Sequence, residues 1–235
     1  MLKIENYEVV GWEHVIRGMR NPMNSWEKSD SVFTQHTLED WPHNTVKTFD
    51  ALGANDHDLM KRLRNAGTDH RKFMRMITVY VDITAPLYWW KEFDTYKIGT
   101  VANSCSTMHK IHDKEFMLED FSCEHLDDDC SSFEVNIGDH FYPLSALDVL
   151  KITIEVLNYW RRRYLATKNK DDWRQMIQLL PSSYNQKRTI MFNYEVLANI
   201  YKSRKNHKLD EWHVVCDWIE SLPYSELITG TSEQN

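Results

Sequence analysis

The stretch MITVYVDITAPLYWWKEF, residues 76–93, decides the fold that we expect for this chain. β-branched and aromatic residues fill positions 76–84 and a proline follows at position 86, which predicts a strand. Pro86 also suits the first turn of a helix, because a proline there gives up no helical hydrogen bond. The pattern predicts a strand that leads directly into an aromatic helix with four apolar residues on one side: Leu87, Trp90, Phe93 and Ile98.

Helical signals lie on both sides of this stretch. Before it, Asp56 can cap a helix that ends at Gly67. After it, apolar residues recur at helical spacing from Ser145 to about Lys168. Two more helices are expected, one after Leu180-Pro181 with apolar residues from Ile190 to Tyr201, and one with apolar residues from Leu209 to Ile219. Residues 99–142 are polar and predict a long loop with one short strand near Ser132–Ile137.

Composition limits the function classes. The 235 residues are 42% hydrophobic and 27% charged, which fits a globular chain with a large core. The net charge of −7 argues against nonspecific binding of duplex nucleic acid, which needs a basic face. No apolar run approaches the roughly 18 residues of a membrane span, and the N-terminus lacks an apolar segment. We therefore expect a cytoplasmic protein without a membrane segment, whose four cysteines are reduced thiols.

Four common site motifs are absent from the sequence. It contains no GxGxxG, no GxxxxGK[ST], no GxSxG and no HExxH pattern. These patterns are typical of nucleotide-binding loops, hydrolase nucleophiles and zinc proteases. Any site must therefore be assembled from residues that are distant in the sequence.

Two segments of the chain show a distinctive order of elements. Residues 59–97 follow the order helix, glycine, strand, Ala-Pro, aromatic helix and loop. Residues 180–212 place a Leu-Pro pair before a segment with two asparagines, an arginine and a tryptophan. Together the two segments resemble the flavin-dependent thymidylate synthases. The resemblance implies an α+β fold, helix-rich with a small mixed sheet, as a single domain over residues 1–235.

The second segment carries residues whose roles the resemblance implies. Asn193 and Asn199 fall where family members hydrogen-bond the flavin. Arg204 falls where an arginine contacts the uracil nucleotide, and Lys187 and Arg188 where another binds its phosphate. Arginine suits this role because its planar fork can bond carbonyl or phosphate oxygens at two points.

The family signature itself is altered. Thr95, Tyr96 and Lys97 stand where the family has a basic triplet that binds the cofactor, and only Lys97 keeps a positive charge. Asn103 replaces an acid, and Cys105 replaces a serine, in the part that orients the nucleotide. The resemblance therefore implies a cofactor site at Thr95, Tyr96 and Lys97 and a substrate site at Asn103 and Cys105, both with changed contacts.

The activity that the resemblance implies is transfer of a one-carbon unit to C5 of a uracil deoxynucleotide, dUMP to dTMP, or of a closely related pyrimidine nucleotide. FAD would be the cofactor, NADPH and methylenetetrahydrofolate the co-substrates, and a homotetramer the assembly. In such chemistry the flavin carries out the redox steps, and the protein binds and orients the reacting groups. The alternative is a catalytically altered relative that keeps the fold and binds a nucleotide or partner without methylating it.

Each of these residues also has a structural interpretation. Asn193 and Asn199 can be amides satisfied in the core, and Arg204 can complement a helix dipole. Trp89 and Trp90 are more typical of a core than of a ring-stacking site. A third hypothesis is a zinc module, because cysteines and histidines cluster between positions 105 and 130. Their spacing matches no paired CxxC pattern, so we predict no metal site.

Overall fold

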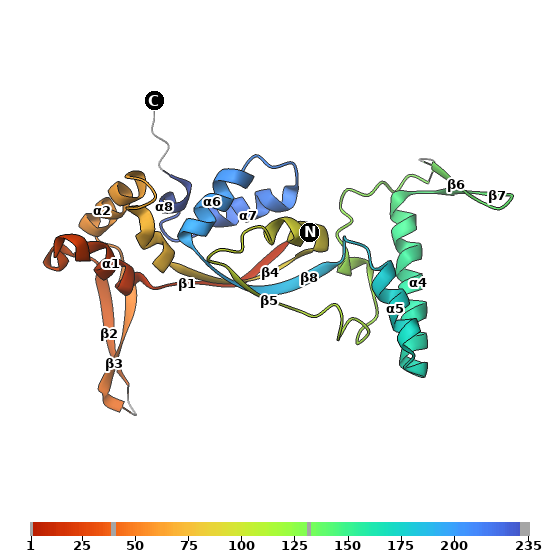
Figure 1. The fold of residues 1–235 in the computed structure, drawn as a ribbon, viewed down its shortest axis with the longest axis horizontal. Coiled ribbons are helices and arrows are strands. Elements are labelled where there is room, and N and C mark those ends of the chain that lie inside the picture. The colour runs from red at the N-terminus through yellow and green to blue at the C-terminus, as the bar shows by residue number, and fades with distance from the viewer. Residues whose placement is uncertain (1, 39–40, 131–132, 231–235) are drawn as a thin grey trace. The chain divides into compact units, whose positions relative to one another are not determined.

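The computed structural model describes residues 2–38, 41–130 and 133–230 (Figure 1). By their contacts these residues form two units. Unit 1 comprises residues up to Glu5, Asp82–Thr95 and Ala102–Thr189, and unit 2 comprises Asn6–Val81, Tyr96–Val101 and the residues from Ile190 onward. The division falls within strands of the largest sheet, so the single domain over residues 1–235 stays a prediction.

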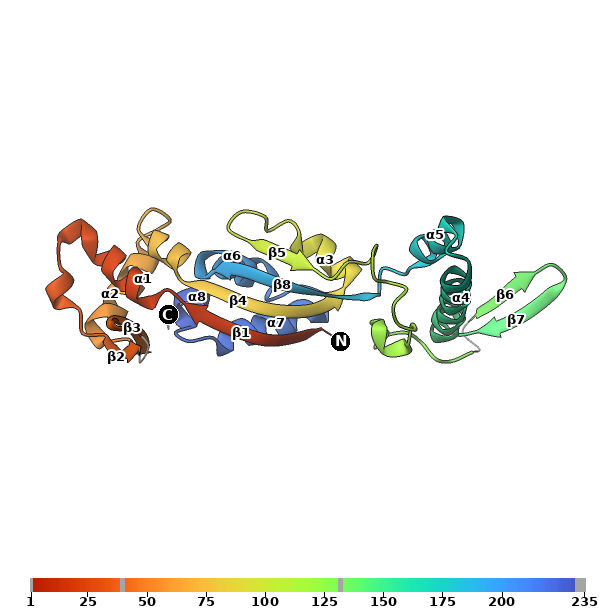
Figure 2. The same cartoon turned by 90° about the horizontal axis from the view of Figure 1, so that it is seen from below.

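The largest sheet has four strands in the order β1-β4-β8-β5 (Figure 2). Their bounds are β1 Lys3–Val10, β4 Thr78–Pro86, β5 Val101–Ser104 and β8 Asn185–Asn193. In β4, alternate residues from Val79 to Ala85 are buried, as expected when one face of a strand packs on a core. The predicted strand in this region is therefore confirmed, and so is the α+β class.

Among its described residues, unit 1 contains three helices, one 3-10 turn and a hairpin. These elements are α3 Leu87–Phe93, the 3-10 turn η4 Leu118–Asp120, the antiparallel pair β6 Phe133–Ile137 and β7 His140–Leu144, α4 Ala146–Thr167 and α5 Lys170–Leu179. Ser145 caps α4 in a capping box with Asp148, and the two backbone-to-side-chain bonds are 3.0 and 3.1 Å long. The core beneath α4 combines side chains from the helices and the preceding loop: Ile111, Phe116, Phe121, Leu150, Ile154, Leu157 and Met176.

Unit 2 contains the remaining helices and a long hairpin. Its elements are α1 Trp12–Arg20, the 3-10 turns η1 Asn21–Met23 and η2 Trp26–Lys28, the antiparallel pair β2 Val32–Leu38 and β3 Trp41–Ala51, α2 Ala54–Asn65, η3 Arg71–Met76, α6 Tyr194–Arg204, α7 Asp210–Ser221 and α8 Glu226–Thr229. The β2–β3 hairpin extends away from α1 and α2 in Figure 1. Helix α6 is its most buried helix, with six of its residues buried.

Several helix predictions are confirmed and three details are wrong. The helices predicted over 145–168 and over 209–219 are present as α4 and α7, and the strand near 132–137 is present as β6. The helix expected after Leu180-Pro181 is wrong in its first part, because residues 185–193 form β8 and α6 begins only at Tyr194. The reason is burial at alternate positions, at Ile190 and Phe192, which suits a strand rather than a helix.

The other two corrections concern helix ends. Asp56 does not cap α2, because that helix begins at Ala54 and Asp56 is buried within its first turn. The Asp30 carboxylate accepts hydrogen bonds from the N–H groups of Asn55 and Asp56 instead, at 2.9 and 3.1 Å. Ile98 lies beyond the end of α3 and is 94% exposed, so it does not belong to the apolar side of that helix.

Two strands were not expected in the polar stretch 99–142. They are β5, which joins the largest sheet beside β8, and β7, which pairs with β6. Among the residues that the structure describes, no helix has both the length and the hydrophobicity needed to cross a bilayer.

Candidate functional site

Arg204 lies in an aromatic cluster of unit 2. It is the last residue of α6, and its Nε donates a hydrogen bond of 2.9 Å to the Tyr96 hydroxyl. The guanidinium carbon lies 4.7 Å from the ring centre of Trp212 and 5.6 Å from that of Tyr96. Both distances are in the range of cation–π attraction. The arginine therefore occupies a fixed place between two rings, instead of extending into solvent as a simple dipole partner would.

Local sequence explains this cluster. Helix α6 ends at Arg204 and α7 begins at Asp210, so the short connection brings Trp212 back beside the arginine. The loop after α3 supplies Tyr96. In that loop Gly99 has a φ of +76°, and a Cβ there would lie 3.1 Å from the Asn193 Nδ2 atom. Glycine thus allows the loop to approach the start of α6 closely.

Asn193, Asn199 and Lys97 are the other predicted cofactor contacts in unit 2. Asn193 ends β8 and caps α6, and its Oδ1 atom accepts a hydrogen bond of 3.1 Å from the Val196 N–H. Asn199 is exposed on α6, so the interpretation as a core amide is wrong for it. Lys97 is exposed in the loop after α3. The expectation that one helix carries both asparagines is therefore wrong, because Asn193 ends β8 and only Asn199 lies within α6.

Lys187 and Arg188 lie on β8 in unit 1, and carboxylates accompany both. The Lys187 Nζ atom lies 3.1 Å from Asp82 and 3.5 Å from Glu5. Its hydrogen bond to Asp82 and the attraction of both carboxylates raise the pKa of Lys187 above its ordinary value. An anionic ligand at Lys187 must therefore compete with two carboxylates of the same chain.

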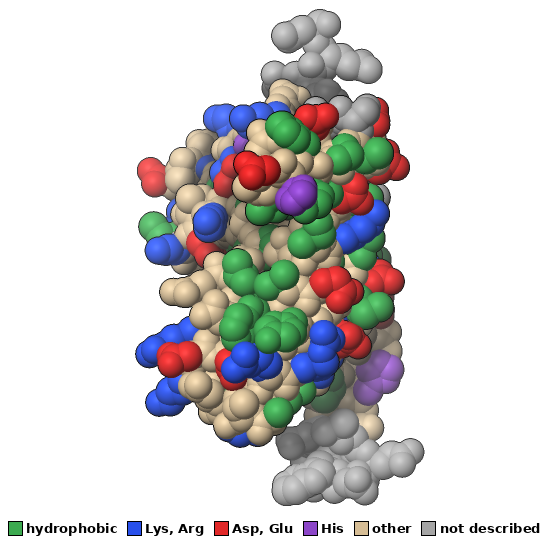
Figure 3. Space-filling model, turned by 90° about the vertical axis from the view of Figure 1, so that its right-hand side faces the viewer, with side chains coloured by type: hydrophobic (Ala, Val, Ile, Leu, Met, Phe, Trp, Pro, Cys, Tyr) green, Lys and Arg blue, Asp and Glu red, His purple; other side chains and the backbone are tan. Residues whose placement is uncertain are grey.

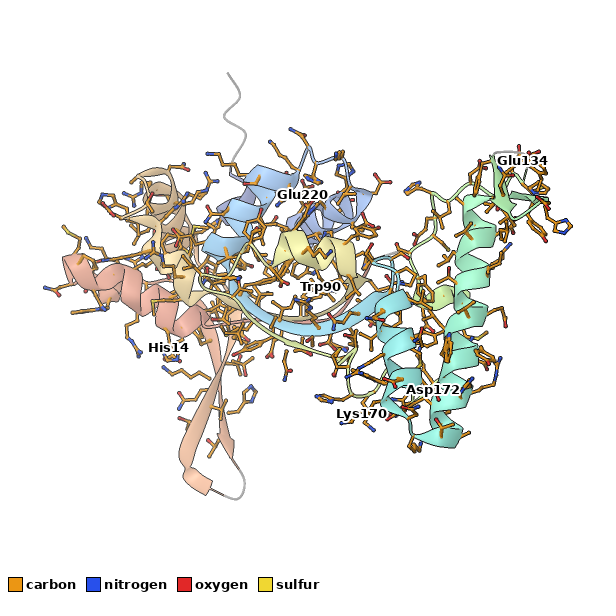
Figure 4. The ribbon with its side chains drawn as sticks, turned by 45° about the vertical axis from the view of Figure 1, so that its right-hand side comes forward. His14, Trp90, Glu134, Lys170, Asp172 and Glu220 are labelled. Carbon is orange, nitrogen blue, oxygen red and sulfur yellow. The ribbon has the colours of Figure 1, made fainter. Side chains whose placement is uncertain are left out.

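Arg188 is held on three sides. Its Nη1 donates to Asp94 at 2.7 Å and its Nε donates to the Gln186 side chain at 3.0 Å. The guanidinium carbon lies 4.2 Å above the ring of Trp90, which Figure 4 labels on α3. Trp90 is buried, so the core interpretation is correct, and its ring also supports the arginine.

Asn103, Cys105 and Thr95 have different surroundings in unit 1. Asn103 is exposed on β5, and Cys105 is an exposed thiol. The Cys105 N–H donates to the Lys187 carbonyl at 2.9 Å, so β8 fixes the backbone at this residue. Thr95 is exposed and donates to the Glu92 carbonyl at 2.8 Å, which closes the end of α3. The structure thus brings Cys105 next to Lys187, while Thr95 has a structural partner.

Three contributors were missing from the predicted site. They are Trp212, whose ring supports Arg204, and Asp94 and Gln186, which bind Arg188. Trp212 belongs to the segment that resembles the family, so the resemblance gave a signal for it. Asp94 and Gln186 gave none, because their pairing with Arg188 depends on the fold.

No metal centre is apparent in residues 2–38, 41–130 and 133–230, where no three or more histidine, cysteine, aspartate or glutamate side chains gather as ligands. The cysteines and histidines between positions 105 and 130 therefore do not gather into a set of three within these residues.

Comparison with known proteins supports the fold. No protein-family model matches the sequence, and no curated protein matches it significantly. Among solved structures, thymidylate synthase X of Helicobacter pylori with FAD and dUMP is 16% identical over 97% of this chain and 98% of that one, with a TM-score of 0.63. A UMP/dUMP methylase, PolB of Streptomyces cacaoi, solved with 5-bromo-dUMP, is 12% identical over 94% of this chain and 88% of that one, with a TM-score of 0.54. The chain therefore has the fold of the flavin-dependent thymidylate synthases.

Proposed function

We propose that this chain binds FAD and a uracil nucleotide and transfers a one-carbon unit to C5 of the uracil ring, converting dUMP to dTMP or acting on a closely related pyrimidine nucleotide. The observation that carries the proposal is Arg204, held by the rings of Tyr96 and Trp212 in a fold whose solved neighbours contain FAD and dUMP. A guanidinium fixed in this way is suited to the oxygens of a uracil or a phosphate.

The side chains of unit 2 fit a flavin nucleotide in their chemistry. The exposed amide of Asn199 and the Nδ2 group of Asn193 can donate to the flavin carbonyls, and exposed Lys97 can neutralise a pyrophosphate charge. Tyr96 of the same unit is a further proposed cofactor contact, and Thr95, which belongs to unit 1, is the last one that the resemblance implies. FAD would supply the redox chemistry, and these residues would bind and orient it.

Besides Arg204, four residues of unit 1 are proposed nucleotide contacts. Lys187 and Arg188 would hold the phosphate, and Asn103 and Cys105, both exposed, would face the nucleotide. Phosphate binding requires the cations to exchange their carboxylate partners, at least in part. We also propose NADPH and methylenetetrahydrofolate as co-substrates, a homotetramer as the assembly, and the cytoplasm as the location.

A second candidate is a relative that binds the nucleotide but does not methylate it. The observation that favours it is the pairing of Lys187 and Arg188 with carboxylates, at 3.1 and 2.7 Å. The altered triplet supports it too, because Lys97 alone keeps a charge there. Such a protein would keep the fold while its phosphate contacts are weakened.

The first experiment measures flavin and nucleotide in the purified protein. A yellow protein with flavin absorbance near roughly 450 nm supports the proposal. A colourless protein that takes up no added FAD contradicts it. If flavin and nucleotide bind, dTMP formation from dUMP, NADPH and methylenetetrahydrofolate separates the candidates, because the second one forms no dTMP.

The second experiment tests Arg204 by calorimetric titration with dUMP. Arg204→Ala should weaken binding about 10- to 150-fold, because a charged hydrogen bond is worth about 1.5–3 kcal/mol. Lys202→Ala is the matched control, since Lys202 is exposed on the same helix and should leave the affinity unchanged. Equal affinity in both variants would remove Arg204 from the site. Asn199→Ala should in turn lose flavin more readily than the wild type during dialysis.

A further inference from the structure

Unit 2 contains an open cavity that none of the proposed cofactor or nucleotide contacts lines. It has a volume of about 670 Å³, and its walls are the end of β1, the start of α1, the base of the β2–β3 hairpin and the loop before α8. His14, which Figure 4 labels on α1, is one of the lining residues. A cavity of this size can hold a small organic molecule. We call it the hairpin cavity.

Four aromatic side chains line the hairpin cavity and pack on one another: Trp12, Phe33, Phe49 and Tyr224. The rings of Trp12 and Phe49 are stacked with 5.0 Å between their centres, and the Phe33 ring meets Phe49 edge-on at 5.5 Å. Phe33, Phe49 and Tyr224 are only half-buried. Partly exposed rings that already support one another provide a surface for a flat or apolar group, or for a cation.

One of these rings is held from both ends. Tyr224 has a φ of +54°, a left-handed conformation that is costly for a residue with a side chain. Its hydroxyl accepts a hydrogen bond of 2.8 Å from the Leu52 N–H, just after the hairpin. Its ring also meets Trp12 edge-on at 5.3 Å. The loop before α8 is thereby fastened to the hairpin, and a ring that is already fixed loses little freedom when a ligand binds.

The charged side chains around the hairpin cavity are mostly acidic. Glu8, Glu13 and Asp50 all line it. Lys47 lies 3.1 Å from Glu13 and balances that carboxylate. Asp50 accepts a hydrogen bond of 2.6 Å from the Thr34 hydroxyl, which leaves its negative charge in place. Within the part of the chain that the structure describes, neither Glu8 nor Asp50 forms an ion pair with a lysine or an arginine.

A surplus of one charge sign is not general on this molecule. On the face that Figure 3 shows, basic and acidic side chains are mixed among hydrophobic ones. The hairpin cavity instead combines aromatic rings with two unbalanced carboxylates. A cation is attracted by both, because the ring faces and the carboxylates are negative, whereas an anion is repelled by both.

We propose that the hairpin cavity binds a small organic cation, an ammonium ion attached to an apolar or aromatic body. The ammonium group would lie beside the carboxylates of Glu8 and Asp50, and the body would pack on the rings of Phe33 and Phe49. A bare metal ion fits less well, since no three metal-ligating side chains gather among the described residues. The site shares no residue with the proposed FAD and nucleotide contacts, so it does not depend on the proposed enzymatic function.

Calorimetric titration with a matched pair of probes tests the proposal. Phenethylammonium and phenethyl alcohol have nearly the same shape, but only the first carries a charge. The cation should bind about 5- to 30-fold more tightly than the alcohol, and added sodium chloride should weaken the binding of the cation alone. Equal affinities for the two probes overturn the proposal, and so does a failure of the cation to bind.

Single variants show whether binding takes place in this cavity. Glu8→Gln and Asp50→Asn should each weaken the cation about two- to fivefold and leave the affinity for the alcohol unchanged. Asp58→Asn is the matched control, because it removes one charge from an exposed site on α2 that does not line the cavity. Phe33→Leu should weaken both probes, since it removes a ring. Unchanged cation affinity in both acidic-site variants, or an equal loss in Asp58→Asn, contradicts the assignment. Circular dichroism of every variant shows whether the fold is intact.

Discussion

Replacing Asp56 with alanine should destabilise unit 2 strongly, because it leaves a buried cation without its partner. The Arg20 Nε atom lies 2.6 Å from the Asp56 carboxylate, and the two side chains are only 4% and 0% exposed. The same carboxylate also accepts hydrogen bonds from the Ser29 and Ser31 hydroxyls at 2.7 and 2.6 Å. The ion pair thus joins α1, α2 and the loop between η2 and β2.

The magnitude follows from this burial. Breaking a buried ion pair from one side costs about 3–5 kcal/mol. In a chain of this size each kcal/mol lowers the melting temperature by about 2–4 °C, so Asp56→Ala should lower it by about 6–20 °C. The free energy of unfolding is measured by chemical denaturation followed by circular dichroism.

A double-mutant cycle can refute this reasoning. Removing both charges, in Arg20→Met with Asp56→Ala, no longer leaves a bare cation in the interior. The double variant should therefore be less destabilised than the sum of the two single variants by about 2 kcal/mol or more. Additive effects would show that the cost of Asp56→Ala comes from lost hydrogen bonds and not from the unpaired charge.

The ion pair should also show a pH dependence of a definite sign. Burial on its own would raise the pKa of Asp56, but hydrogen bonds from Ser31, Ser29 and Arg20 lower it below the ordinary value. The folded state therefore holds its proton less tightly than the unfolded chain does. The stability that Asp56 contributes is present above the ordinary aspartate pKa and is lost as the pH falls through the lowered one. The difference in stability between wild type and Asp56→Ala should shrink in acid.

Two further predictions concern single side chains. Ser145→Ala removes the cap of α4 and should lower the free energy of unfolding, measured by thermal denaturation, by about 1 kcal/mol. Ser203→Ala, at an exposed site, should leave it almost unchanged. Equal effects of the two changes would exclude a role for the cap. Burial, with the charges of Asp217 and Glu220, raises the pKa of the Cys216 thiol to about 11. At about pH 8, iodoacetamide should therefore modify Cys105 and Cys130 in the native protein but leave Cys216 unmodified, as measured by peptide mapping. Labelling of all three would contradict its burial.

Local patterns in the sequence were sufficient for several elements. Helix α4 and its Ser145 start could be predicted because spacing and capping are properties of neighbouring residues. Strand β4 was equally clear from its β-branched run. Strand β8 was not, because its apolar residues also fit helical spacing and only burial on alternate sides separates the two cases. Asp56 was predicted to cap a helix because aspartate is common at that position, and its actual partner, Arg20, is too distant in the sequence to be predicted from a local pattern.

Part of the candidate site, too, could be predicted from the sequence, and part of it was decided only by the fold. The sequence alone indicated Arg204, Asn193 and Asn199 through a family resemblance, and showed that the basic triplet of the signature is reduced to Lys97. Only the tertiary structure places Arg204 between two aromatic rings and pairs Lys187 and Arg188 with carboxylates. Spacing along the chain indicates a helix because helical hydrogen bonds join residues four apart, and it indicates a strand through the alternation of side chains between two faces. The charge state and orientation of a binding side chain depend instead on neighbours that are distant in sequence, and folding alone brings those together.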